Sequence, residues 1–139
     1  DGDRPLAQLG QIQSMRMLAK YFPFGIAEIH TSDAVRCYET VAPMARSFSL
    51  DMIYWTELSE YAFEKDKKPA IKVVEEIIES EARAIVCGHN PVLPGIVAKL
   101  IGKKSFKELD HGLLPGESWI LHHRDGEILA IDWMSAPES

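Results

Sequence analysis

Two short segments of the sequence place phosphate-binding types of side chain directly after an expected β-strand. In the first, His30–Cys37, a strand passes into a helix whose opening turn carries Arg36. In the second, residues 86–91, an apolar strand ends at Gly88 and His89, and a helix begins within a few residues. Arginine and histidine bind phosphate oxygens by charge-assisted hydrogen bonds. Ligands of open α/β sheets bind outside the carboxyl ends of the strands, where helix N-termini present N–H groups. We therefore predict that Arg36 and His89 converge on one phosphate.

A third expected strand is followed by two glutamates, Glu57 and Glu60. A carboxyl group at that place could protonate a departing oxygen as a general acid. For each of these residues a structural interpretation remains open. Arg36 can be a charge on a helix surface, His89 a loop histidine with a structural hydrogen bond, and the glutamates solvated side chains.

Other arrangements do not support chemistry. His122 and His123 are adjacent in an expected strand, so their side chains point to opposite faces and cannot share a metal ion. Gly95 and Gly102 are separated by six residues, not the four of a P-loop, and Gly102-Lys103 is followed by Lys104 and not by Ser or Thr. We find no nucleophile-elbow serine, no dinucleotide fingerprint and no CxxC motif.

Hydrophobic periodicity alternates between helix and strand along the chain and positions these segments. The expected elements are a helix over 6–21, a strand over 26–31, a helix from 32 or 33 to 48 that Pro43 kinks or divides, a strand over 51–55, an irregular stretch over 56–66, a helix from 69, a strand over 83–88, a helix over 94–100, and strands over 118–123 and 128–134 joined by an Asp-Gly turn. This order predicts an α/β fold: a three-layer sandwich with a mostly parallel open sheet, helices on both faces and a C-terminal β-hairpin.

Length and composition limit the classes of function. The 139 residues, 46% hydrophobic and 26% charged, suit one globular domain that spans residues 1–139. The net charge of −6 opposes nucleic-acid binding, which needs a basic face. No apolar run approaches the roughly 20 residues that span a bilayer, and no signal peptide is evident. Cys37 and Cys87 are typical of reduced thiols, so we expect a cytoplasmic protein that does not act at membranes.

The motifs together resemble the histidine phosphatase (phosphoglycerate mutase-like) superfamily over nearly the whole chain. The matching residues are Arg4-Pro5-Leu6 with Gly10 and Gln13, Thr31-Ser32 with Val35-Arg36-Cys37 and Glu39-Thr40, Leu58-Ser59-Glu60, and Gly88-His89-Asn90-Pro91. The chain is most similar to the C-terminal domain of actinobacterial two-domain hydrolases. In these a Nudix domain precedes the phosphatase domain, and the family removes oxidised guanine nucleotides and dinucleoside polyphosphates.

The resemblance implies a role for each matching residue. Arg36 corresponds to the second phosphate-binding arginine and His89 to the second histidine, which contacts the phosphate oxygens. Asn90 matches a position whose backbone amide often completes the phosphate pocket. Glu60 matches the proton donor, with Glu57 as its rival. No metal ion or other cofactor is implied, because cationic side chains take the electrostatic role.

One family motif is missing from the chain. The nucleophile of the family is a histidine in an Arg-His-Gly or Arg-His-Ala triplet at the end of the first strand, and none of the six arginines here precedes a histidine. The strand over 83–88 reads as buried on both faces, yet its expected partner is absent from the sequence. We expect that the chain is a piece lacking its first, nucleophile-bearing strand. The alternative is a natural form that has lost its nucleophile.

The expected function is therefore a phosphohydrolase domain that acts through a phosphohistidine intermediate. Its expected substrate is a phosphorylated small molecule, a nucleoside di- or triphosphate by resemblance, and its expected partner is a Nudix domain of the same protein. The alternatives are a protein phosphohistidine phosphatase and a non-catalytic module that binds phosphate or a protein partner.

Overall fold

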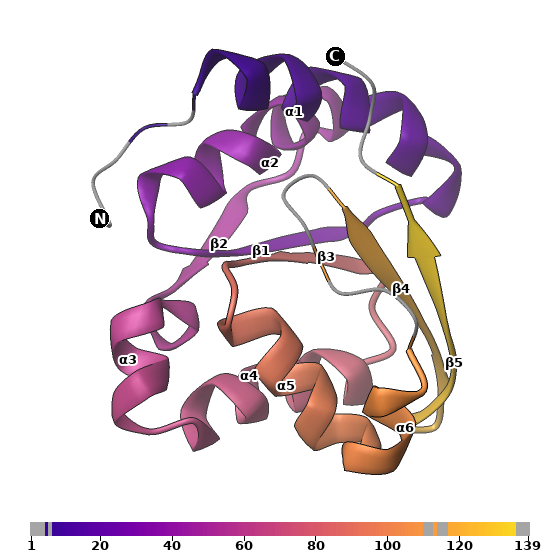
Figure 1. Ribbon diagram of the computed structural model, residues 1–139. Helices are drawn as coiled ribbons and strands as arrows, with labels where there is room; N and C mark the ends of the chain where they lie inside the picture. The colour runs from indigo at the N-terminus through magenta and orange to yellow at the C-terminus, as the bar shows by residue number, and fades with distance from the viewer. Residues whose placement is uncertain (1–4, 6, 110–112, 114–116, 136–139) are drawn as a thin grey trace.

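A parallel sheet of three strands lies at the centre of the molecule (Figure 1). The computed structural model describes residues 5, 7–109, 113 and 117–135. The strands are β1 (Glu28–Ser32), β2 (Met52–Trp55) and β3 (Ala84–Cys87), in the order β2-β1-β3. The middle strand β1 is buried from Ile29 to Ser32, because it has a hydrogen-bonded neighbour on each edge and helices on each face.

Two helices that pack against each other, α1 (Gln8–Tyr21) and α2 (Val35–Phe48), cover one face of this sheet (Figure 1). The layer buries a cluster in which Ile29 of β1 and Met44 of α2 are fully inaccessible to solvent. Pro43 lies inside α2 and does not divide it, because the buried residues Val41 and Met44 hold the helix against the sheet on either side of it. No helix in the described part of the chain is long and apolar enough to cross a membrane.

The opposite face is covered by the helices between β2 and the C-terminal hairpin (Figure 1). These are the 3-10 turn η2 (Thr56–Leu58) and the helices α3 (Glu60–Lys65), α4 (Lys68–Glu79), α5 (Val92–Ile101) and α6 (Lys103–Lys107). Their core centres on Leu58, Ala70, Val92 and Ile96, all fully buried or nearly so. On the face covered by α1 and α2, a short 3-10 turn, η1 (Phe22–Phe24), leads from α1 towards β1.

The C-terminal hairpin forms a second, separate sheet of two strands, β4 (Ser118–Arg124) and β5 (Glu127–Met134). Asp125 and Gly126 both adopt positive φ angles, 52° and 81°, as the two-residue turn of a hairpin requires. The turn docks on the end of α4, where the backbone N–H of Asp125 donates to Glu81 Oε1 at 2.8 Å. At its other end the hairpin reaches α1, where Lys20 Nζ donates to the Ser135 carbonyl at 2.7 Å.

The structure confirms the α/β sandwich and corrects its details. The stretch 56–66, expected to be irregular, forms η2 and α3, because the Ser59 hydroxyl caps α3 and Phe63 is buried against α5. Helix α2 begins at Val35 instead of 32 or 33, since Ser32 is still paired within β1 and Asp33 and Ala34 form the connection from the sheet. Helix α5 begins two residues earlier than expected, and α6 was not predicted. Strand β3, expected to be buried on both faces, is only half-buried along its whole length.

Candidate active site

The register of the parallel strands brings three connections to one edge of the sheet. Thr31 of β1 lies opposite Cys87 of β3, and Ser32 lies opposite Trp55 of β2. The segments that follow these residues lead to α2, α5 and η2, so they leave the sheet side by side. The structure thus places Arg36, His89 and the two glutamates after neighbouring strand ends, where open α/β sheets bind ligands.

Arg36 occupies the first turn of α2 and is half-buried. Its Nε atom is inaccessible to solvent and has no hydrogen-bond partner within the described part of the chain. A buried N–H of a guanidinium without an acceptor is costly, so this donor calls for an explanation. The next residue, Cys37, carries the contact to the second segment.

His89 meets this turn of α2 directly. Its Nε2 atom lies 3.3 Å and its Nδ1 atom 3.7 Å from the Sγ atom of Cys37. His89 is half-buried, and the contact ties the β3–α5 connection to α2 across 52 residues of sequence. Arg36 and His89 are therefore joined through Cys37. Their convergence on a single phosphate stays a prediction.

The connection before Arg36 is held in shape by short-range hydrogen bonds. The backbone N–H of Ala34 donates to the Ser32 hydroxyl at 3.1 Å, and the Thr31 hydroxyl donates to the Ser32 carbonyl at 2.9 Å. Both hydroxyl residues are completely buried. Serine and threonine at such a turn satisfy backbone groups that no helix or sheet pairs. The turn fixes where α2 begins and hence where Arg36 lies.

The two candidate acids differ in their surroundings. Glu60 is exposed at the first position of α3, directly after the capping residue Ser59, whose hydroxyl accepts from the Ala62 N–H at 3.1 Å. Glu57 is half-buried in η2, and its Oε1 accepts from the Thr56 hydroxyl at 3.2 Å. Both follow β2 at the same sheet edge as Arg36, so the choice of Glu60 over Glu57 stays a prediction.

Asn90, expected to offer its backbone amide, is exposed and uses its side chain for a structural contact. Its Nδ2 atom donates to the Leu113 carbonyl at 2.7 Å. The Asn90–Pro91 peptide bond is cis. These contacts hold the segment that follows β3, whereas the role of the Asn90 amide in binding phosphate stays a prediction.

The sequence predicts that the two cysteines are reduced thiols, and it does not reveal their contact with each other. Cys87 Sγ donates to the Cys37 carbonyl oxygen at 3.5 Å, so the two residues are in contact. The hydrogen bond from Cys87 lowers the pKa of Cys37 to about 5, against the opposing effect of burial, and His89 lowers it further. The same hydrogen bond and burial raise the pKa of Cys87 well above its usual value. The signal in the sequence was the alternation of β3, which turns Ile85 and Cys87 towards the α1–α2 layer.

A second polar cluster also escaped sequence reasoning. His30 on β1 is buried, its Nδ1 accepts from the Trp55 indole N–H at 2.9 Å, and its Nε2 lies 2.9 Å from Glu28 Oε1. Trp55 stacks on the His30 ring at a centroid distance of 6.2 Å. This pair anchors the end of β2, from which the segment with Glu57 and Glu60 departs.

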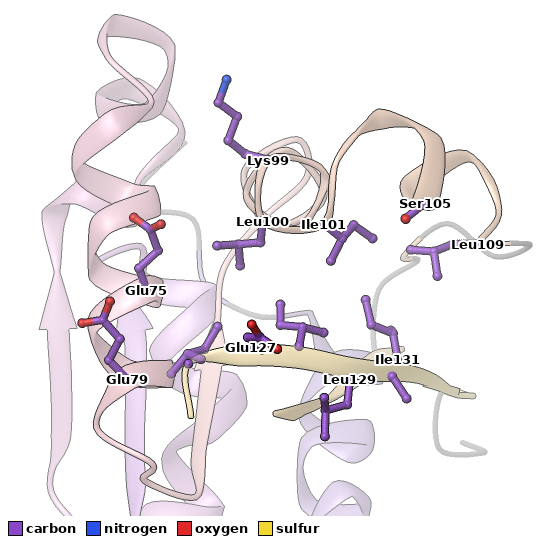
Figure 2. Close-up of a pocket in the computed structure, with 14 residues that line it drawn as sticks. Glu75, Glu79, Lys99, Leu100, Ile101, Ser105, Leu109, Glu127, Leu129 and Ile131 are labelled. Carbon is purple, nitrogen blue, oxygen red and sulfur yellow. The ribbon is translucent and has the colours of Figure 1, made fainter. Parts of the chain in front are cut away.

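A hollow of about 620 Å³ lies away from these strand ends, between α4, α5, α6 and β5 (Figure 2). Apolar side chains such as Leu100 and Ile131 line it, with Glu75, Glu79 and Lys99 at its rim (Figure 2). None of the candidate catalytic residues contributes to it. Within the described residues, no group of three or more potential ligands could hold a metal ion.

Comparison with known proteins relates the chain to a family of phosphatases. Residues 1–70 match the model of the histidine phosphatase superfamily, branch 1. The chain is 30% identical over 140 residues to the 8-oxo-(d)GTP phosphatase of Mycolicibacterium smegmatis, a match that covers 99% of this chain and 43% of that protein. It therefore spans less than half the length of this curated relative.

Two solved structures share the fold at low sequence identity. SixA of Agrobacterium tumefaciens superposes with a TM-score of 0.72 at 21% identity, over 97% of this chain and 85% of that one. The protein histidine phosphatase SixA in complex with tungstate superposes with a TM-score of 0.76 at 17% identity, over 98% and 86% of the two chains. With the family model matching half of its residues, the chain belongs to the histidine phosphatase superfamily.

Proposed function

We propose that this domain is the phosphate-binding and acid-bearing part of a phosphohydrolase that acts through a phosphohistidine intermediate on a nucleoside di- or triphosphate. The observation that carries the proposal is the buried, unpartnered Nε of Arg36 at the sheet edge that also bears His89. Because this Nε has no acceptor within the described residues, a bound dianion would not have to displace one there.

In this proposal Arg36 and His89 bind the non-bridging oxygens of the transferred phosphoryl group. Negative charge is spread over these oxygens in the transition state, so fixed donors lower the barrier without reorganising. A histidine nitrogen attacks phosphorus, the bond to the leaving oxygen breaks, and Glu60, or its rival Glu57, donates the proton that this oxygen needs. Water then attacks the phosphohistidine and releases inorganic phosphate.

The nucleophilic histidine is proposed to lie on a further strand that pairs with β3. Strand β3 is hydrogen-bonded to β1 along one edge, and no strand pairs with its other edge within the described residues. Its four residues are apolar or weakly polar and yet half-exposed, whereas β1, with two neighbours, is buried. An unpaired apolar strand edge is a liability that proteins usually cover, so β3 favours a further strand beside it.

The substrate class rests on the 8-oxo-(d)GTP phosphatase to which the chain is 30% identical. Because this chain matches 43% of that protein, a Nudix domain in the same polypeptide is part of the proposal. Hydrolysis of a phosphohistidine protein, or phosphate binding without turnover, are the outcomes that would replace it.

The test compares the chain extended by its natural upstream sequence with variants of it, on 8-oxo-GTP and on a phosphohistidine protein. Arg36→Ala and His89→Ala should each lower the rate on the nucleotide by roughly 10²–10³-fold, as the loss of one oxyanion donor does. Arg46→Ala, on the exposed side of α2, is the matched control and should retain full activity. Full activity of Arg36→Ala, or turnover of the phosphohistidine protein alone, would overturn the assignment.

A further inference from the structure

We propose that Cys37 and Cys87 form a peroxide-sensitive modification site, in which Cys37 is oxidised first and Cys87 closes a disulfide next to His89. Nothing in the phosphatase chemistry needs either thiol. The two residues are in contact, because Cys87 Sγ donates to the Cys37 carbonyl oxygen at 3.5 Å, and Cys37 Sγ in turn lies 3.3 Å from His89 Nε2.

The elements that carry the thiols favour their approach. Cys87 is the last residue of β3 and points into the layer of α1 and α2, and Cys37 is in the first turn of α2 above it. Cys37 is 3% exposed, and its Sγ contacts the half-buried ring of His89. In this proposal a small oxidant reaches the sulfur past His89, because that ring is the more exposed of the two side chains.

The charges around Cys37 make it the thiol that reacts first. A thiolate, not a thiol, attacks peroxide. The groups that face Cys37 are the Cys87 thiol, the His89 ring and the Ser32 hydroxyl, and all three stabilise its thiolate. Cys87 is the opposite case, because burial and the neighbouring thiolate keep its proton on, and Tyr21 beside it is held neutral by burial.

The reaction balances with hydrogen peroxide as the oxidant. The Cys37 thiolate attacks one peroxide oxygen, the O–O bond breaks, and the leaving hydroxide takes a proton to become water, which leaves a sulfenic acid on Cys37. Cys87 then loses its proton and attacks the sulfur of Cys37, the S–O bond breaks, and a second water leaves. In sum, two thiols and one peroxide give one disulfide and two waters.

Closure of the disulfide changes the surroundings of the proposed phosphate site. It removes the thiolate 3.3 Å from His89 Nε2 and ties the turn that carries Arg36 to the end of β3. Conversely, an anion bound by Arg36 and His89 covers the route to Cys37. The expected protection of the thiols by phosphate rests on the proposed function, whereas disulfide formation does not.

The experiment treats the folded chain with hydrogen peroxide at pH 6 and follows the thiols by mass spectrometry. We expect one intramolecular disulfide, seen as the loss of two hydrogen atoms, at a rate about tenfold above that of the same chain in urea. That factor is the gain in thiolate at a pKa of about 5, reduced by the weaker nucleophilicity of an acidic thiolate. Cys87→Ser should accumulate a sulfenic acid on Cys37 that dimedone traps, and Cys37→Ser should lose the fast phase.

Each outcome decides one of the two proposals. Equal rates in the folded and urea-unfolded chain, or two sulfinic acids without a disulfide, would refute the modification site even if phosphate binds. A disulfide whose formation is not slowed by inorganic phosphate would keep the modification site and contradict the phosphate site of Arg36 and His89. Circular dichroism of each variant verifies that it is folded before oxidation.

Discussion

Replacing Arg36 by methionine should strengthen the fold and weaken phosphate binding at the same time. The Nε atom of Arg36 is buried and has no acceptor within the described residues. Methionine keeps an unbranched apolar stem of similar length and removes the cationic head. If the guanidinium is held in place for a ligand, the folded chain without that ligand should gain from its removal, as expected where function opposes stability.

The magnitude follows from that one unsatisfied donor. Burying a polar group without a hydrogen bond costs about 1–3 kcal/mol, so Arg36→Met should raise the free energy of unfolding by about 1 kcal/mol after some loss of packing. For a chain of this length that is a rise in Tm of roughly 4 °C. Losing a hydrogen bond from a charged donor to phosphate costs about 1.5–3 kcal/mol, which is roughly a 10- to 150-fold higher Kd.

The assay is urea unfolding together with calorimetric titration of inorganic phosphate, on the wild-type chain, Arg36→Met and Arg46→Met. Arg46 lies on the same helix, is exposed, and should change either quantity by no more than about 0.5 kcal/mol. A lower free energy of unfolding for Arg36→Met with an unchanged Kd would show that the guanidinium has a structural role. That result would refute the assignment of Arg36 to phosphate binding.

Three further outcomes test the surroundings of the site. The pKa of Cys37 is lowered to about 5 in the fold, so the unfolded chain binds more protons than the folded chain between pH 5 and 8. The free energy of unfolding, measured with urea, should therefore rise with pH over this range. Cys37→Ser should flatten the rise. Trp55→Phe removes the N–H that donates to His30 Nδ1 at 2.9 Å, so it should lower the free energy of unfolding by about 1 kcal/mol in the same assay. In a chain that already carries His30→Phe, the same substitution should have little effect. Gly95→Ala would put a methyl group 2.7 Å from the Phe63 ring and force α3 away from α5. It should lower the free energy of unfolding by about 1–2 kcal/mol, although alanine favours helices more than glycine does. An unchanged Tm for this last variant would show that the α3–α5 contact yields without cost.

Where burial and periodicity decide an element, the sequence is sufficient to predict it. The apolar stripe of Ile71, Val74 and Ile78 predicts α4, and the structure buries Val74 and Ile78 in the core that centres on Leu58 and Ile96. The Asp-Gly pair predicts the hairpin turn, because both residues tolerate a positive φ angle. The parallel strands follow from alternation of helix and strand. These features depend on residues close together in the sequence, so they can be predicted without knowledge of the fold.

Features that depend on contacts between residues distant in the sequence cannot be predicted in this way. Helix α3 has only six residues and is fixed by the cap at Ser59 and the packing of Phe63, neither of which produces a periodic pattern. The contact of Cys37 with His89 spans 52 residues and depends on the register of β1 with β3. The position of His89 at a strand end is predictable, whereas the side chain it touches is not.

The mismatch between pattern and burial at β3 is itself informative about how the sheet is completed. A run of Ala, Ile, Val and Cys is typical of a parallel strand covered on both faces, and β1 shows what that cover looks like. Both strands are flanked by the same helical layers, so the layers do not explain the difference in burial. The difference lies at the strand edges: β1 has two hydrogen-bonded neighbours and β3 has one within the described residues, while β4 and β5 pair only with each other there. A further strand beside β3 would bury its outer edge, and its carboxyl end would reach the sheet edge where Arg36 and His89 lie. The nucleophile that the proposed chemistry requires would then be positioned by the same strand that completes the sheet.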